Sequence, residues 1–206
     1  MTTLDLQHTG IQASGTLTSG TVEARATAAL LTCVARFGLA KTTIDDLARE
    51  AGCSRATLYR YFDSKAAIVR LTVDVEITRV TTAAVDAGLV EPSLGDAIVA
   101  VSLQAARDLD GHAALSFLLA HEPESIVSHL TFAEGDRVLV WVGDALAPAF
   151  TRWLPEPEAA RAGEWIARVL RSYVLMPEPT IDLTDAPTAR EFFRALVVPG
   201  LGVHDG

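Results

Sequence analysis

Apolar side chains recur every three or four residues along nearly the whole chain, which is the spacing of amphipathic helices. In residues 21–40, for example, Ala26, Leu30 and Val34 follow this spacing, and Gly38 stands where a glycine commonly ends a helix. The sequence therefore predicts an all-α protein. The predicted helices cover residues 21–40, 43–51, 54–62, 65–87, 93–109, 112–121, 124–130, 133–153, 157–176 and 187–198.

Proline and glycine separate the predicted helices of the second half, because they open or end helices. The breaks fall at Pro92, Gly111, Pro123, Pro155, Pro157 and within residues 176–187. The apolar run at residues 138–142 also has the composition of a short strand, and this alternative stays open at this stage.

Two short predicted helices, joined by a tight turn at Gly52, have the spacing of a helix-turn-helix. Ala48 is small where the helices would cross closely, Gly52 follows four positions later, and Leu58 lies six positions beyond that. Thr43 and Asp46 form a capping-box pattern at the start of the first helix. Ser54 and Ser64 are good N-caps for the second helix and for the long helix after it. The buried positions would be Ile44, Leu47, Ala48, Ala51, Leu58 and Phe62.

Hydrogen-bond donors gather on the second of these helices. Arg55 stands at its N-terminus, where a recognition helix enters the major groove, and its guanidinium suits a guanine edge or a phosphate. Hydroxyl and ammonium groups nearby suit phosphates, which fix the register of a protein on DNA. The candidate DNA contacts are Thr43, Arg55, Thr57, Tyr59, Tyr61 and Lys65. Alternatively, the tyrosines only pack and the arginines are only solvated.

Charge is distributed unevenly along the chain. The formal net charge is -9, yet residues 21–70 hold eight Lys and Arg against five Asp and Glu. Residues 81–206 hold eight Lys and Arg against 18 Asp and Glu. Because acidic surface repels phosphate, we expect any contact with nucleic acid in the N-terminal part alone.

The segment TTIDDLAREAGCSRATLYRYFDSKAAIVRL (42–71) resembles the DNA-binding signature of the TetR (tetracycline-repressor) family. Cys53 departs from the pattern, since an aliphatic residue is commoner there. The similarity covers residues 21–71, and the matching positions are Phe37-Gly38, Thr42-Thr43, Leu47-Ala48, Ala51-Gly52, Leu58-Tyr59, Tyr61-Phe62 and Lys65.

The resemblance implies an all-α homodimer with a small N-terminal three-helix helix-turn-helix domain that binds DNA. It also implies a larger helical domain for ligand binding and dimerisation. We expect a flexible arm over residues 1–20, the DNA-binding domain over 21–66 and the larger domain over 67–206.

In this family the ligand cavity lies between the middle helices. The apolar residues there suggest a hydrophobic or amphipathic small-molecule effector. The candidates are Leu103, Phe117, Leu118, His121, Val138, Trp141 and Val142. The alternative is that these residues form an ordinary core, and for any single one of them this is the favoured interpretation.

The last two long helices of the family form the dimer interface. Here they carry broad apolar faces that would be exposed on a monomer. The candidate interface residues are Trp165, Val169, Tyr173, Phe192, Phe193 and Leu196. Closure of the monomer's own core is the alternative.

Catalytic and metal-binding motifs are missing from the sequence. It has no G-x-S-x-G, no H-E-x-x-H and no P-loop. His112, His121 and His129 have no metal-ligand spacing, and the two cysteines form no C-x-x-C motif. We therefore expect no enzyme, no metal and no cofactor.

The N-terminus has no basic segment followed by an apolar core, so it does not predict a signal peptide. No apolar run reaches the roughly 18 residues of a membrane span. These observations favour a cytoplasmic protein without a membrane partner.

The expected function is that of a homodimeric repressor on a palindromic double-stranded DNA operator, released by the small-molecule effector. Two alternatives stay open. In the first, the chain is still a DNA-binding regulator, but its ligand acts as a co-activator or is absent. In the second, the chain is a protein-interaction module with a vestigial DNA-binding domain.

Overall fold

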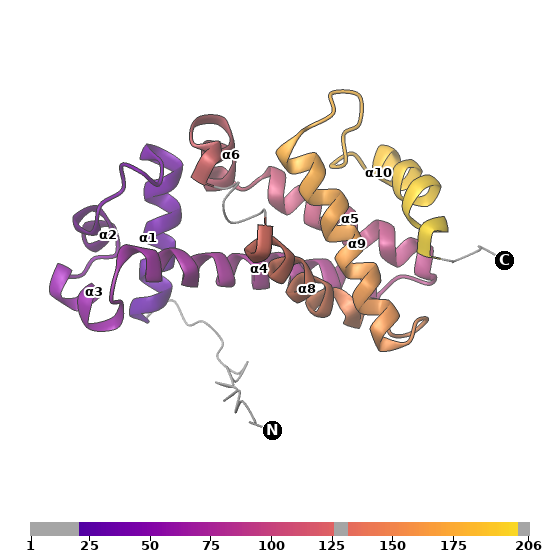
Figure 1. Ribbon diagram of the computed structural model, residues 1–206, viewed down its shortest axis with the longest axis horizontal. Helices are drawn as coiled ribbons and strands as arrows, with labels where there is room; N and C mark the ends of the chain where they lie inside the picture. The colour runs from indigo at the N-terminus through magenta and orange to yellow at the C-terminus, as the bar shows by residue number, and fades with distance from the viewer. Residues whose placement is uncertain (1–20, 126–131, 202–206) are drawn as a thin grey trace, which may run out of the picture.

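The computed structural model describes residues 21–125 and 132–201, which form helices and no strands (Figure 1). The predicted all-α class is confirmed. The α-helices are α1 (Val22–Phe37), α2 (Ile44–Glu50), α3 (Arg55–Tyr61), α4 (Lys65–Leu89), α5 (Leu94–Asp110), α6 (Ala113–His121), α8 (Phe132–Leu146), α9 (Glu156–Leu175) and α10 (Ala186–Phe192). Shorter turns are the 3-10 helices η1 (Ala147–Ala149) and η3 (Pro199–Leu201) and the π-helix η2 (Phe193–Val197).

Local capping explains why most helices begin where the sequence predicts. Thr43 and Asp46 form the predicted capping box of α2, while Ser54 and Ser64 cap α3 and α4. Gly38 ends α1 with φ 82° and ψ 166°, a conformation that only glycine adopts easily. Most of the predicted helix at 124–130 lies outside the described residues.

The strand alternative for residues 138–142 is wrong, because these residues lie inside α8. Their burial follows a helical rather than an alternating pattern. Leu139 is buried and Val142 packs on the core, whereas the adjacent Val140 and Trp141 are exposed.

The N-terminal core packs α1, α2 and α3 against the start of α4. Its central side chains are Leu47, Leu58 and Ile68, all of them 0% exposed. Ala114 of α6 belongs to the same core, so α6 also reaches these helices. Figure 1 shows α1, α2 and α3 at one end of the molecule and α6 beyond α1.

The C-terminal core lies between α4, α5, α8, α9 and α10, and its largest buried side chains are Phe150 and Phe193. Helices α8 and α9 cross very closely at two glycines. A Cβ atom on Gly143 would lie 2.7 Å from the Ala160 carbonyl oxygen, and one on Gly163 would lie 2.8 Å from the Gly143 carbonyl oxygen.

Helix α4 takes part in both cores and joins the two ends of the molecule (Figure 1). Ile68 near its start is buried in the N-terminal core, and Ala84 near its end is buried in the C-terminal core. Any change in the direction of α4 therefore moves one core relative to the other.

Candidate nucleic-acid interface and ligand cavity

The turn between α2 and α3 is compact and begins with a left-handed glycine. Gly52 has φ 63°, and the Cys53 N–H donates to the Ala48 carbonyl oxygen at 3.0 Å. The burial of Leu47 on α2 and of Leu58 on α3 then fixes the angle between the helices. The predicted helix-turn-helix is thus present as a structural unit.

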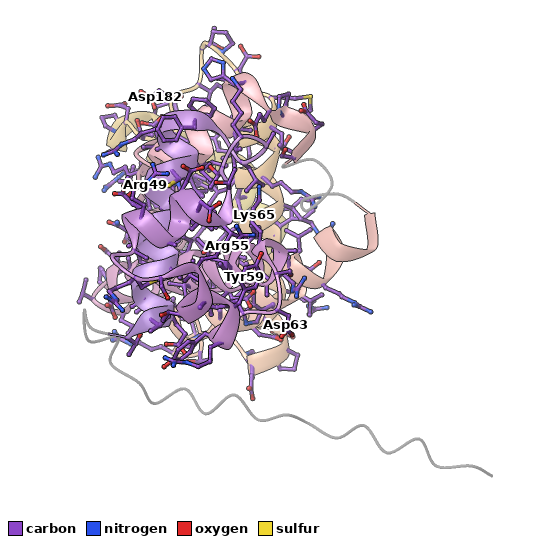
Figure 2. The ribbon with its side chains drawn as sticks, turned by 90° about the vertical axis from the view of Figure 1, so that its left-hand side faces the viewer. Arg49, Arg55, Tyr59, Asp63, Lys65 and Asp182 are labelled. Carbon is purple, nitrogen blue, oxygen red and sulfur yellow. The ribbon has the colours of Figure 1, made fainter. Side chains whose placement is uncertain are left out.

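The outer face of α3 carries guanidinium groups beside aromatic rings. Arg55 lies 5.6 Å from the ring centre of Tyr59, and Arg60 lies 5.2 Å from that of Tyr61. Both tyrosines are 46% exposed. In Figure 2, which views the N-terminal end, Arg55, Tyr59 and Lys65 lie on one face of the molecule. This face can offer cations and phenolic hydroxyls to a polyanion.

Arg55 is paired only loosely within the chain. Its guanidinium lies 3.3 Å from the Asp45 carboxylate, and both side chains are largely exposed. Hydrogen bonding to Tyr59, followed by the charge of Asp45, raises the pKa of Arg55. Exposed pairs of this kind contribute little stability, so Arg55 can exchange Asp45 for another anion at small cost.

The predicted threonine contacts are used locally. The Thr43 hydroxyl and backbone N–H both donate to the Asp46 carboxylate, and these two hydrogen bonds hold the pKa of Asp46 below its ordinary value. The Thr43 hydroxyl also accepts from the Asp46 backbone N–H. The Thr57 hydroxyl lies 2.8 Å from that of Ser54. Each hydroxyl keeps acceptor or donor capacity, but a contact with DNA would share it with these partners.

Lys65 binds the α1–α2 turn, which comprises residues 38–43. Its Nζ donates to the carbonyl oxygens of Leu39 at 2.7 Å and Thr42 at 2.8 Å. An ammonium has three N–H donors, so one remains for a phosphate. The structure therefore gives Lys65 a positioning role that the sequence did not predict.

Glu122, the residue after α6, holds the same turn from the other side. Its Oε2 accepts hydrogen bonds from the backbone N–H groups of Leu39 at 2.9 Å and Ala40 at 3.1 Å. A Cβ atom on Gly38 would lie 2.1 Å from the Glu122 carboxylate. The α1–α2 turn is thus held by a carboxylate at its amides and by an ammonium at its carbonyls. No sequence signal marks this contact.

A cavity of about 330 Å³ lies between α1, α4, α5, α6, α8 and α9. Of the predicted pocket residues, Leu118, Val138 and Val142 line it. The principal wall comes from one face of α4, which the sequence analysis did not single out. Its residues are Val69, Thr72, Val73, Glu76, Ile77, Val80, Thr81 and Ala84.

The other predicted pocket residues are not among those that line the cavity. Leu103 packs against the C-terminal core. Phe117 and His121 contact each other, with ring centres 4.6 Å apart, and Trp141 is 38% exposed. These positions lie on α5, α6 and α8, which also line the cavity, but on other faces of these helices.

A charged network lies between the cavity and a neighbouring surface groove. Glu76 Oε2 accepts from Arg79 at 2.8 Å and lies 3.3 Å from His112 Nε2, and both Glu76 and His112 line the cavity as well as the groove. Arg79 also pairs with Asp108 at 3.0 Å. The network forms a polar boundary beside an otherwise apolar space.

The predicted interface residues divide into exposed and buried groups. Trp165 is 48% exposed and Leu196 is 64% exposed, which suits contact with a second copy. Val169, Tyr173 and Phe192 are partly buried against the C-terminal core. Phe193 is 0% exposed, so its assignment to the interface is wrong. It fills the protomer's own core.

Within residues 21–125 and 132–201, no three His, Cys, Asp or Glu side chains are grouped to hold a metal ion. His129 lies outside these ranges. No helix of this part of the chain is both long and apolar enough to cross a bilayer.

Comparison with known proteins gives a family match and a set of similar folds. Residues 26–71 match the family of bacterial regulatory proteins, tetR family. No curated protein matches the chain. Among solved structures, the TetR family repressor AlkX from Dietzia sp. strain DQ12-45-1b, implicated in biodegradation of n-alkanes, has a TM-score of 0.69 at 18% identity, covering 92% of this chain and 98% of AlkX.

A transcriptional regulator from Rhodococcus sp. Rha1 has a TM-score of 0.57 at 16% identity, with 90% of this chain and 100% of that chain covered. A TetR family transcription regulator from Marinobacter aquaeolei VT8 has a TM-score of 0.54 at 18% identity, with 82% of this chain and 94% of that chain covered. At these identities the solved structures show a shared fold, and the family match is confined to residues 26–71. The segment that resembles the tetR-family regulators therefore contains the helix-turn-helix formed by α2 and α3.

Proposed function

We propose that the protein is a homodimeric repressor whose operator affinity is lowered by a small molecule bound in the cavity. The observation that carries this proposal is the double role of α4. One helix packs against the helix-turn-helix through Ile68 and forms the main cavity wall from Val69 to Ala84. The division into a DNA-binding domain (21–66) and an effector domain (67–206) belongs to this proposal.

The exposed face of α3 would supply the main DNA contacts. Arg55 is free to leave Asp45, and Tyr59 and Tyr61 present half-exposed rings with hydroxyl groups. Thr43, Thr57 and Lys65 would add phosphate contacts near the helix starts, within the limits set by their internal partners.

A twofold dimer would place two copies of α3 in successive major grooves of a palindromic operator. Half-sites of this kind lie about 34–36 Å apart, or a multiple of that distance. The exposed side chains of Trp165 and Leu196 support an interface formed by α9 and the C-terminal segment. Such a regulator would act on genomic DNA in the bacterial cytoplasm.

Release from the operator would follow if the ligand binds one orientation of α4 more tightly than the other. A ligand that binds better when α4 is tilted favours that tilt and moves the two α3 helices away from the operator spacing. A co-activating ligand would favour the DNA-binding geometry instead, so the sign of the ligand effect separates these cases.

Fluorescence anisotropy with the DNA upstream of the protein's own gene, or with fragments selected from the genome, tests this function. Arg55→Ala and Tyr59→Ala should each weaken binding by about 1–3 kcal/mol at fixed salt. Arg152→Ala is the matched control, because Arg152 also stacks on a ring, that of Trp153 at 5.3 Å, but in the C-terminal half. Equal affinity of all these variants for the selected DNA would contradict the proposal.

A further inference from the structure

The wall of the cavity is aliphatic. Among the described residues that line it there is no Phe, Tyr or Trp, and Leu, Val, Ile and Ala predominate. The Thr72 and Thr81 hydroxyls, which could have made the wall polar, donate to carbonyl oxygens of α4 itself, at 2.8 Å to Ile68 and 2.9 Å to Ile77. The one ring among these residues is the His112 imidazole, which lies 3.3 Å from Glu76 through its Nε2, so a flat aromatic ligand would find little to stack on along this wall.

The cavity is also long. Its lining residues on α4 run from Val69 to Ala84, which at the helical rise spans about 22 Å. The far end is closed by Ala84 and Leu146, both members of the C-terminal core. A space of this length can hold an extended chain along α4.

The near end reaches the N-terminal core. Leu30 and Val34 of α1 line the cavity and are also buried members of that core. Leu39, whose N–H is held by Glu122, lines it as well. A ligand that reaches this end therefore contacts residues that position the helix-turn-helix.

We propose that the effector is a molecule with a saturated, unbranched alkyl chain, and that it acts on DNA binding only when the chain is long enough to reach Leu30 and Val34. This inference rests on the proposed function and specifies its ligand. A shorter chain would occupy the part of the cavity between α4, α8 and α9 and leave α1 in place. A longer chain would separate α1 from α4 and so favour the geometry with lower operator affinity.

Binding is measured first without DNA, by thermal shift and isothermal titration, with octanoic, dodecanoic and hexadecanoic acids below their micelle concentrations. Hexadecanol tests whether the carboxylate matters, and tetraphenylphosphonium serves as the aromatic cation. Affinity should rise by roughly fourfold for each added methylene that enters the cavity. Tighter binding of tetraphenylphosphonium than of every alkyl compound would overturn the assignment.

The length threshold is read from hydrogen exchange of the α1 amides around Leu30 and Val34 in ligand-saturated protein. Hexadecanoic acid should speed this exchange severalfold, whereas octanoic acid at saturation should leave it unchanged. Equal effects of the two acids would overturn the threshold. This measurement needs no DNA, so its outcome is independent of the proposed function. The proposed function fails if the protein binds no operator, or if no bound ligand changes its affinity for the operator.

A substitution at the far end gives an independent check. Ala84→Leu fills the far end of the cavity, where both acids are placed, and should weaken hexadecanoic and octanoic acids alike by about tenfold or more, given the dependence on buried methylenes. Ala83→Leu adds the same side chain one position away, outside the cavity lining, and should change the affinity for neither acid. If Ala84→Leu fails to fold, the acid series on the wild-type protein decides the question. Equal affinities of both variants for hexadecanoic acid would contradict the placement of its chain.

Discussion

Removal of the Glu122 carboxylate should loosen the α1–α2 turn. Two backbone N–H groups, those of Leu39 and Ala40, donate to Glu122 Oε2 at 2.9 and 3.1 Å. A hydrogen bond to a charged group contributes about 1.5–3 kcal/mol when buried. Since Ala40 is exposed and water can replace Glu122 there, we expect Glu122→Ala to lower the unfolding free energy by about 2 kcal/mol in total.

Glu122→Gln is the matched control. Both hydrogen bonds end on the same oxygen, so the amide oxygen of glutamine can accept both while the charge is lost. This variant should lose less than about 1 kcal/mol.

Calorimetry and amide exchange together test this reasoning. For a chain of this size, about 2 kcal/mol corresponds to a fall in Tm of about 4–8 °C for Glu122→Ala. The amides of Leu39 and Ala40 should lose protection in this variant and keep most of it in Glu122→Gln. Unchanged exchange at these two amides in Glu122→Ala would refute the role assigned to the carboxylate.

Three further predictions concern backbone geometry and acid stability. Gly38→Ala, with φ 82° and a carboxylate in the way, should lower Tm more than Gly52→Ala, which has φ 63° and open space; the reverse order in calorimetry would contradict this. The pKa of Asp46 lies below its ordinary value of 3.8, so its stabilising effect is present above that pH and is lost as pH falls through the lowered pKa. Asp46→Asn should therefore be less stable near neutral pH, and its Tm should fall less steeply as the pH is lowered. A fall of Tm with pH as steep as that of the wild type would contradict this. Gly143→Ala should cost about 1–3 kcal/mol in denaturant unfolding, because its Cβ would meet the α9 backbone; an unchanged unfolding midpoint would show that the helices can separate freely.

The helix order could be predicted from the sequence because the signals are local. The Thr43–Asp46 box, the Ser54 and Ser64 caps and the glycine at 38 each act within a few residues, and the structure shows all of them. Apolar spacing does the same for the long helices, since it depends only on the helical repeat.

The cavity was harder to predict because its position depends on how helices cross. The face of α4 that lines it mixes aliphatic residues with Thr72, Glu76 and Thr81, and it becomes a cavity wall only because α1, α6, α8 and α9 are placed around it. Glu122 contacts a turn 83 residues earlier in the chain, and a single sequence carries no sign of that pairing.

Phe193 shows a different limit of sequence reasoning. Regular helical spacing groups it with Leu196 on one apolar face, yet it is 0% exposed while Leu196 is 64% exposed. The π-helical turn η2, in which the Val198 N–H donates to the Phe193 carbonyl oxygen, widens the helix here. A wider turn changes the register, so positions that share a face in an α-helix separate.

The arrangement around the α1–α2 turn has a consequence for protein engineering. A chimera that joins the DNA-binding helices of one regulator to the effector-binding helices of another would have its junction at the start of α4. The α1–α2 turn of this chain would then be separated from its own Glu122, because the residue after α6 would come from the other regulator. A functional chimera should therefore carry a carboxylate after α6 together with a glycine at the end of α1, so that the two donors of the turn find their acceptor again.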